Sequence, residues 1–368
     1  MSRVLQDPTV AGLDETLNRA LAASRAPGAQ AALVRRGEVL WTGSAGLADL
    51  ETGTPITDDT VFCLASLGKT LVAALALRLM EERLLDLDAP ISAVRGDDLP
   101  GATVVTPRML LTHTSGYPDL YESPEVQTLF PPEEGRGGEA YDPDRVFTFA
   151  VLAAGLREPV EPGDRWAYSN TGYIVLTEVL SRILGGDRAI QAAWTSFVHG
   201  DLADDVLTLD RSAVPLGRLA HGYDEHPDGT FVHPYAAYQA AGVPTDLFGL
   251  PFGDGLFAGT AVGVGMFLDA LFVRETLLDP PTVRVMTTVT PQAAAGDEPE
   301  QKTYGMGTFA VLGPGGAWQG HRGRYGGFST LGASQRESGL TLVVLCNGLT
   351  DEIPAVQVWE AVAAALLP

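Results

Sequence analysis

Residues 66–84, SLGKTLVAALALRLMEERL, set the strongest limit on how this chain can fold. Their first part places apolar residues on nearly every face of a helix, so no face of that helix suits water. Other elements must therefore cover it on all sides. The chain of 368 residues, 45% of them hydrophobic, is long enough to do so in one large domain or two intertwined ones. The sequence predicts a buried helix that ends near Leu84.

Strand patterns gather at the two ends of the chain, and helical patterns fill its middle. Residues 14–24 read as a helix, and residues 29–49 give two apolar runs around Arg36-Gly37, which is typical of a β-hairpin. Between residues 304 and 348, three further stretches read as successive strands, and residues 354–367 close the chain with a helix.

This order predicts an α/β (α+β) fold in which both chain ends build one antiparallel sheet flanked by helices. Residues 1–84 and 300–368 are assigned to that sheet domain, and residues 85–299 to an inserted, mainly helical domain that carries the active-site loops. Helical patterns within the insertion cover residues 107–112, 143–155, 171–184, 189–199 and 260–272. The segments expected to be least ordered, because their composition supplies little to bury, are 122–142 and 291–302.

The charge balance narrows the range of partners. Forty-six acidic residues against 24 basic ones give a formal net charge of −22, which repels nucleic acid and anionic membrane surfaces. Every apolar run of about 18 residues is broken by a charge or a helix breaker, so no membrane span is expected. The N-terminus lacks the basic start and apolar run of a secretory signal, and we expect a cytoplasmic protein.

The spacing of the cysteines and histidines predicts no metal site. Cys63 and Cys346 show no paired spacing of a zinc site or a disulfide framework, which fits a reducing compartment. His221, His226 and His233 gather in one hairpin-like segment, but they lack the helical two-histidine spacing of a metal site. We expect these histidines on the surface or along a cleft.

Lys69 is out of place on an apolar helix, because desolvating an ammonium group costs several kcal/mol. Residues three apart share a helix face, so Ser66 and Lys69 can bring hydroxyl and amine within hydrogen-bonding distance. Desolvation and the positive end of the helix dipole both disfavour the ammonium form, which gives the serine a proton acceptor. Taken by itself, the commoner interpretation of the pair is an N-cap serine beside a lysine that faces solvent.

Two later stretches carry polar groups at places that suit a site. WAYSNTGYIVLTEVL places Tyr168 and Asn170 at a loop-to-helix junction, where they can supply a phenol and an amide. GHRGRYGGF puts His321 and Gly323 on a strand crowded with glycine, where the backbone can approach a ligand closely. Taken alone, the first is an N-capping turn, and the second is an edge strand or a bulge.

In the order Ser-x-x-Lys, Tyr-x-Asn and Lys/His-x-Gly strand, these stretches resemble the serine β-lactamase and penicillin-binding protein superfamily. They are similar to its branch of class C β-lactamases, D-alanyl-D-alanine carboxypeptidases, D-aminopeptidases and related esterases. The resemblance covers roughly residues 14–367 and implies a β-lactamase/transpeptidase-like fold. Further stretches that look like the family are LLTHTSGYPD (110–119), GRLAHGYDEHPDG (217–229), GLFAGTAVGVGMFLDAL (255–271) and YGMGT (304–308).

The resemblance implies a role for each matching residue in the first two motifs. Ser66 would be the nucleophile, and Lys69 its partner in deprotonation. Tyr168 would relay a proton between the serine and the leaving group. Asn170 would hydrogen-bond Lys69 and the substrate amide.

The strand residues have implied roles as well. His321 stands where many members carry lysine, and Gly323 would leave room for the substrate alongside the strand. The backbone N–H groups of Ser66 and Arg324 would form the oxyanion hole, which is worth several kcal/mol whatever side chain Arg324 carries.

The strand motif HRG also bears on the substrate. A lysine-threonine-glycine strand would favour β-lactamase, and tryptophan-glycine-glycine would resemble the known esterases. Histidine at the first position is similar to D,D-peptidases and D-aminopeptidases, although acyltransferases and macrocyclising enzymes share it. Arg322 replaces the usual small hydroxyl residue, and its guanidinium would suit a substrate carboxylate if it faces the cleft. Strand alternation leaves that orientation open.

We therefore expect a serine hydrolase that forms an acyl-enzyme on a small amide, peptide or ester, favouring an amide or peptide with a D-amino acid. The implied chemistry needs no metal and no organic cofactor. A carboxylesterase or acyltransferase of the same fold stays an alternative. So does a β-lactamase-like protein that binds a ligand without turning it over. The expected partner is a small-molecule substrate, and the sequence leaves the oligomeric state open.

Overall fold

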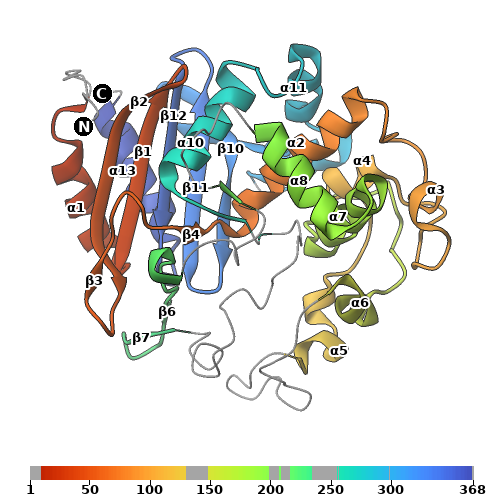
Figure 1. Cartoon of the computed structure of the whole chain (residues 1–368), viewed down its shortest axis with the longest axis horizontal. Helices are drawn as coiled ribbons and strands as arrows, with labels where there is room; N and C mark the ends of the chain where they lie inside the picture. Colours follow the sequence, from red (N-terminus) through yellow and green to blue (C-terminus); the bar gives the residue numbers. More distant parts are fainter. Residues whose placement is uncertain are drawn as a thin grey trace.

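A computed structural model describes residues 10–129, 148–198, 207–208, 216–233, 255, 257–297 and 299–366. Within these residues, a seven-stranded antiparallel sheet runs in the order β3-β2-β1-β12-β11-β10-β9 (Figure 1). Both ends of the chain supply its strands, and the predicted fold class is confirmed. The strands are β1 (Gly28–Arg35), β2 (Glu38–Asp49), β3 (Thr54–Pro55), β9 (Phe309–Gly313), β10 (Gly316–Tyr325), β11 (Phe328–Gln335) and β12 (Leu340–Cys346).

The first and last strands of the sheet in sequence order meet at its centre. β1 pairs antiparallel with β12, where Ala32 lies opposite Val343. β12 pairs with β11 and β11 with β10, where His321 lies opposite Gly332. Strand residues alternate between faces, so Leu342 packs into one hydrophobic cluster and Val343 into another. The sheet is therefore buried on both faces.

Helices cover the two faces in separate layers (Figure 1). α1 (Leu13–Ser24) and α13 (Pro354–Leu366) cover one face, where the rings of Trp318 and Trp359 meet edge to face at 5.2 Å. α10 (Ala261–Leu268) and the π-helical turn η7 (Asp269–Val273) cover the other. α10 belongs to the stretch assigned to the helical domain and yet packs on the sheet, so the proposed division of the chain stays a prediction.

The apolar stretch is buried, as predicted, but it is divided. Ser66 lies in a 3-10 turn, η2 (Ala65–Leu67), and the helix proper, α2 (Gly68–Glu81), begins two residues later and ends before Leu84. α2 contacts β10 on one side and α7 (Asn170–Leu184) on the other. This enclosure explains why its residues from Gly68 to Leu77 are all buried.

The described residues of the inserted part are helical where the sequence predicts helices. Residues 143–147 of one predicted helix, and 130–142 of one low-order segment, lie outside the described residues. The segment 291–302, expected to be poorly ordered, forms two short helical turns. No helix in the described ranges is long and apolar enough to cross a membrane. The remaining helices are α3 (Ser92–Arg95), α4 (Pro107–Leu111), η3 (Leu120–Glu122), α5 (Pro124–Gln127), α6 (Phe149–Leu152), η4 (Ala153–Gly155), α8 (Asp187–Val198), η6 (Leu216–Arg218), α11 (Pro280–Thr287), α12 (Pro291–Ala294) and η8 (Gln301–Thr303).

Short strands complete the described secondary structure around this layer. β4 (Phe62–Cys63) leads directly into η2 and pairs with β8 (Ala258–Gly259), which also pairs with β5 (Leu207–Thr208). β6 (Asp224–Glu225) and β7 (Phe231–Val232) form a separate pair. β4 and β8 thus fix the entry of the chain into the turn that carries Ser66.

Candidate active site

The turn that carries Ser66 is held in an unusual backbone conformation. Ala65, directly before it, has φ 50°, in the left-handed region that residues other than glycine rarely adopt. Two hydrogen bonds fix the turn: Leu64 N–H donates to Phe257 O at 2.8 Å, and Thr330 Oγ1 donates to Leu64 O at 2.8 Å. Phe257, directly before β8, and Thr330 of β11 therefore hold the turn from two sides, and Ser66 faces a cleft.

Lys69 is wholly buried one helical turn after Ser66. Its Nζ lies 3.0 Å from Ser66 Oγ and 2.9 Å from Asn170 Oδ1. The same nitrogen lies 4.9 Å from the centre of the Tyr168 ring, a distance at which a cation is attracted to an aromatic face. The structure thus excludes a lysine that faces solvent.

The start of α7 brings Tyr168 and Asn170 to the cleft. Ser169 caps the helix by accepting from Gly172 N–H, which leaves Tyr168 outside the helix and 40% exposed. Asn170 Nδ2 donates to Asp119 Oδ2 at 2.7 Å, so the amide is held between a lysine and a carboxylate. Asp119 was missed from the sequence, although it ends the family-like stretch LLTHTSGYPD.

Gly323 lets β10 approach the turn that carries Ser66. A Cβ on this residue would lie 2.5 Å from both Leu64 O and Thr330 Oγ1, closer than real atoms pack. The space that the side chain vacates is filled by the turn, whereas the expectation was room for substrate. The backbone of Gly323 still lines the cleft, next to Arg324. No described strand pairs with β10 past Gly320 on the β9 side.

A chain of buried rings connects three segments behind the cleft. Ser169 N–H donates to His113 Nδ1 at 3.1 Å, so the proton of this imidazole sits on Nε2 and is donated to Tyr304 Oη at 3.0 Å. Tyr304 Oη in turn donates to His321 Nε2 at 3.1 Å, and His321 Nδ1 donates to Arg322 O at 2.5 Å. Sequence reasoning missed Tyr304, although it begins the family-like stretch YGMGT.

Burial sets the protonation states of these rings. Burial is the largest cause that lowers the pKa of His321 to about 3 and that of His113 well below its ordinary value. Burial also raises the pKa of Tyr304 well above its usual range. All three rings are therefore neutral near pH 7, as the direction of their hydrogen bonds requires.

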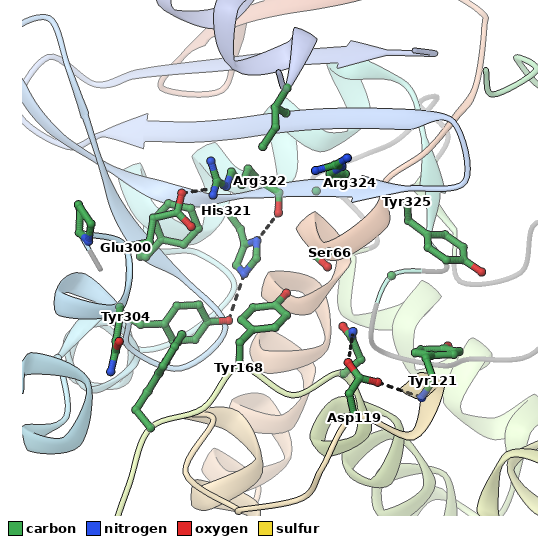
Figure 2. A pocket seen from close by; sticks show the side chains of 18 of the residues that line it. Ser66, Asp119, Tyr121, Tyr168, Glu300, Tyr304, His321, Arg322, Arg324 and Tyr325 are labelled. Atoms are coloured by element: carbon green, nitrogen blue, oxygen red, sulfur yellow. Dashed lines mark hydrogen bonds and ion pairs between the residues drawn. The ribbon is translucent and has the colours of Figure 1, made fainter. Parts of the chain in front are cut away.

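The cleft has a volume of about 860 Å³, and six of the seven predicted site residues line it, with Lys69 beneath them. Figure 2 shows Ser66 between two ends of this cleft. At one end lie Glu300, Tyr304, His321 and Arg322, and at the other lie Asp119, Tyr121 and Tyr325. Arg322 faces the cleft, and its Nε lies 2.8 Å from Glu300 Oε1.

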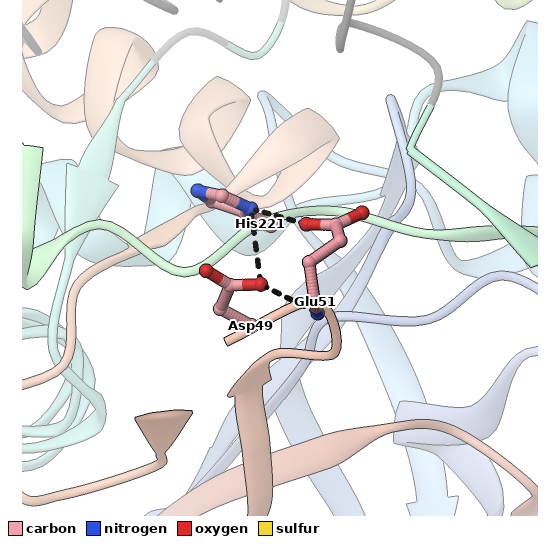
Figure 3. A group of neighbouring side chains, drawn as sticks. All are labelled: Asp49, Glu51 and His221. Carbon is pink, nitrogen blue, oxygen red and sulfur yellow. Dashed lines mark hydrogen bonds and ion pairs between the residues drawn. The ribbon is translucent and has the colours of Figure 1, made fainter. Parts of the chain in front are cut away.

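A separate group of side chains lies at the far end of β2. His221 Nδ1 is 3.5 Å from Glu51 Oε2 and 3.8 Å from Asp49 Oδ1 (Figure 3). Their residue types could ligate a metal, but Asp49 is already committed to its own turn. Burial raises the pKa of Asp49, but hydrogen bonds from Thr52 and from the backbone N–H groups of Glu51 and Thr52 lower it to about 2. We therefore interpret the group as a cluster of polar side chains.

Fold and site together define a β-lactamase-type protein, and the comparisons agree. The family model described as Beta-lactamase matches residues 13–367, so the chain belongs to the β-lactamase family. The predicted superfamily is thereby confirmed. Among curated proteins, it is 42% identical over 111 residues to Esterase EstB of Burkholderia gladioli, and 27% identical over 210 residues to penicillin-binding protein 4* of Bacillus subtilis.

These curated relatives are matched only in part. The alignments cover 29% and 54% of this chain and 28% and 42% of the two relatives. Solved structures match over nearly the whole fold. A D-amino acid amidase from Ochrobactrum anthropi has TM-score 0.79 at 22% identity, covering 98% of this chain and 99% of that one. A D-stereospecific amidohydrolase from Streptomyces has TM-score 0.72 at 24% identity, covering 92% and 94%.

Proposed function

We propose that this protein is a serine hydrolase that acts through an acyl-enzyme. The observation that carries the proposal is the 3.0 Å contact between Ser66 Oγ and the buried Nζ of Lys69. Burying an amine costs free energy, and here Asn170 Oδ1 holds the amine beside the serine hydroxyl. The contact does give the serine hydroxyl a proton acceptor, which a nucleophile needs.

The proposed reaction follows from the residues around Ser66. Its Oγ attacks the substrate carbonyl while its proton passes to Lys69, and the backbone N–H groups of Ser66 and Arg324 hold the oxyanion. The bond to the leaving amine or alcohol then breaks as that group takes a proton through Tyr168 and Lys69, which act as a coupled pair. Water attacks the acyl-Ser66 ester and releases the acid.

The position of Tyr168 distinguishes the two ends of the cleft. Its ring lies 6.5 Å from that of His321 and 6.4 Å from that of Tyr304, between centroids. A group that protonates the leaving group must lie on the leaving-group side of the carbonyl. We therefore name the end lined by Glu300, Tyr304, His321 and Arg322 the leaving-group end, and the end lined by Asp119, Tyr121 and Tyr325 the acyl end.

The proposed substrate is a small amide or peptide with a D-amino acid that carries a free amine. The Asp119 carboxylate lies at the acyl end and binds Asn170, so it can also pair with an ammonium group on the acyl part. Histidine at position 321 and the fold shared with a D-amino acid amidase and a D-stereospecific amidohydrolase support the same substrate class.

Carboxylesterase activity is the second candidate. The match to Esterase EstB, 42% identical over 111 residues, favours it. Transfer of the acyl group to an amine or alcohol differs from hydrolysis only in the nucleophile that reaches the acyl-enzyme. Adding such acceptors to the assay and looking for condensed products distinguishes the two. A non-catalytic ligand-binding protein would have no use for the buried amine of Lys69.

A cytoplasmic location is proposed on a separate observation. Both cysteines lie in the described part of the chain, and neither Cys63 nor Cys346 forms a disulfide. Buried thiols of this kind suit a reducing compartment. The proposed partner is the small-molecule substrate alone, and recovery of the native chain in the cytoplasmic fraction would test the location.

Intact-protein mass spectrometry tests the proposed function. The protein is mixed with D-alaninamide, L-alaninamide and an activated short-chain ester, with the Ser66→Ala variant beside it. A transient acyl adduct on the native protein that is absent from the variant supports the serine mechanism, and faster turnover of the D-amide supports the substrate class. Faster turnover of the ester supports the esterase. Absence of both adduct and product with every substrate would contradict the proposed function.

A further inference from the structure

The segment 299–304 closes the leaving-group end and makes two contacts with β10. Tyr304 Oη donates to His321 Nε2 at 3.1 Å, and Glu300 Oε1 lies 2.8 Å from Arg322 Nε (Figure 2). One short segment thus engages the two side chains of this strand that could bind a substrate from this end. Composition alone marked most of this segment as poorly ordered.

The contact with Tyr304 leaves His321 without a proton to offer. Its Nε2 accepts from Tyr304, and its Nδ1 donates to Arg322 O at 2.5 Å. His113 Nε2–H fixes the direction of the chain, because it can only donate to Tyr304 Oη. His321 therefore supplies neither a positive charge nor a hydrogen-bond donor to a group in the cleft.

The contact with Glu300 places a negative charge where a substrate anion would approach Arg322. Both side chains are about 40% exposed and both line the cleft. An incoming carboxylate would have to displace the Glu300 carboxylate and then remain near its charge, and like charges brought together discriminate against a ligand. The net charge of −22 adds a weaker long-range repulsion.

We propose that the leaving-group end selects substrates whose leaving group carries no carboxylate, and that Glu300 is the residue that sets this preference. The inference rests on the proposed function, because it assumes that Ser66 is acylated. It predicts a neutral amine, ammonia or alcohol as the released product. Arg322 stays in the cleft when Glu300 loses its charge. Its guanidinium is then free to bind a carboxylate of the leaving group, so a substrate with such a group should be accepted.

The test compares two esters that differ at one group: 3-carbamoylphenyl acetate and 3-carboxyphenyl acetate. Their rates of acylation of Ser66, each divided by the rate of hydrolysis in hydroxide alone, give a preference ratio independent of chemical reactivity. We expect the native protein to favour the neutral ester by about tenfold. Glu300→Gln should lower the ratio by about fivefold to tenfold, through faster acylation by the carboxylate ester.

Matched variants assign the effect. Glu300→Gln/Arg322→Gln should raise the ratio above that of Glu300→Gln, because the carboxylate loses its partner, whereas Glu300→Gln/Arg324→Gln should keep the lowered one. Glu122→Gln removes the same charge from the opposite end of the cleft and should leave the ratio unchanged. Equal acylation by both esters in the native protein, or an unchanged ratio in Glu300→Gln, would overturn the inference. No acylation by either ester, together with no adduct or product from the amides, would overturn the proposed function, and this inference with it.

Discussion

Lys69 is wholly buried in the mainly apolar first part of α2, and the free-energy cost of burying its amine can be measured separately from its use in catalysis. Replacing Lys69 by Met keeps the length of the side chain and removes the amine. We expect acylation of Ser66 to fall at least about a thousandfold, because the hydroxyl loses its proton acceptor. The free energy of unfolding should stay level or rise by about 1 kcal/mol, because no amine remains to be desolvated.

Two measurements on the same preparation check this pair of effects. Stopped-flow acylation by an activated ester gives the rate, and urea unfolding gives the stability. Ser66→Ala is the control, since it abolishes acylation without removing a buried amine. A Lys69→Met protein that is clearly less stable than native would show that the lysine is a structural residue.

Gly323 offers a second prediction at the scale of one residue. Gly323→Ala would place a methyl group 2.5 Å from Leu64 O, a backbone atom of the turn that holds Ser66. β10 must then move away from the turn, at a cost of about 1–3 kcal/mol in stability. The backbone N–H of Arg324 moves with it, so kcat should fall about a hundredfold, as for loss of an oxyanion-hole donor.

The control for this prediction is Gly217→Ala, because no atom lies within 4 Å of the added methyl group. Steady-state kinetics and thermal unfolding of both variants give the comparison. Normal kcat in a stable Gly323→Ala protein would show that the strand has room, contrary to the geometry.

At the scale of elements, Tyr304 ties together three segments that are far apart in sequence. Its hydroxyl accepts from His113 and donates to His321, and His113 accepts from the backbone ahead of α7. Tyr304→Phe leaves two buried ring nitrogens without partners, which should cost about 3 kcal/mol. Tyr117→Phe is the matched control, because its hydroxyl makes one hydrogen bond, to Pro100 O, and we expect a smaller loss. Equal losses in urea unfolding would contradict the role given to the ring chain.

Local patterns were enough to predict the elements and the motif residues. Each of these patterns lies within about twenty residues. They are the apolar runs around Arg36-Gly37, the helix with apolar residues on all faces, and the three motifs. Ser66 and Lys69 meet because they are one helical turn apart, and this spacing is fixed by the chain itself. The resemblance then supplied Tyr168 and Asn170, which the structure places in the same cleft.

Contacts across long sequence separations could not be predicted in this way. Asp119 and Asn170 are 51 positions apart, and His113 and Tyr304 are 191 apart. Their meeting depends on how elements pack, which a local pattern does not encode. Glu300 was missed for another reason: composition measures what a segment can bury, whereas Glu300 acts through a charge that stays half-exposed.

At the scale of the whole molecule, the fold brings residues that are far apart in the sequence together in one cleft. β1 and β12 pair at the centre of the sheet, so β10 from the C-terminal part lies beside the turn that carries Ser66. The geometry of the cleft therefore depends on the global fold being intact. Any condition that unfolds the sheet separates Gly323 from Leu64 and abolishes the cleft.

Acid is such a condition, and we expect it to lower the free energy of unfolding. Burial lowers the pKa of His321 to about 3 and that of His113 well below its ordinary value, whereas both rings titrate near 6.5 in the unfolded chain. Between the folded and unfolded pKa values, the histidines are protonated in the unfolded chain and neutral in the folded protein. The stabilisation is thus complete above about pH 6.5 and is lost as the pH falls toward 3. Each histidine contributes a slope of roughly 1.4 kcal/mol per pH unit well below 6.5.

Urea unfolding of the native protein and of His321→Asn between about pH 5 and pH 7 isolates one of these terms, because the carboxylates titrate alike in both proteins. We expect the free energy of unfolding of the variant to fall less steeply as the pH is lowered. The difference in slope should correspond to the uptake of about one proton fewer on unfolding. Identical slopes would mean that His321 is protonated in the folded protein. The direction of hydrogen bonds in the ring chain would then be reversed at Tyr304, and the leaving-group end would carry a positive charge.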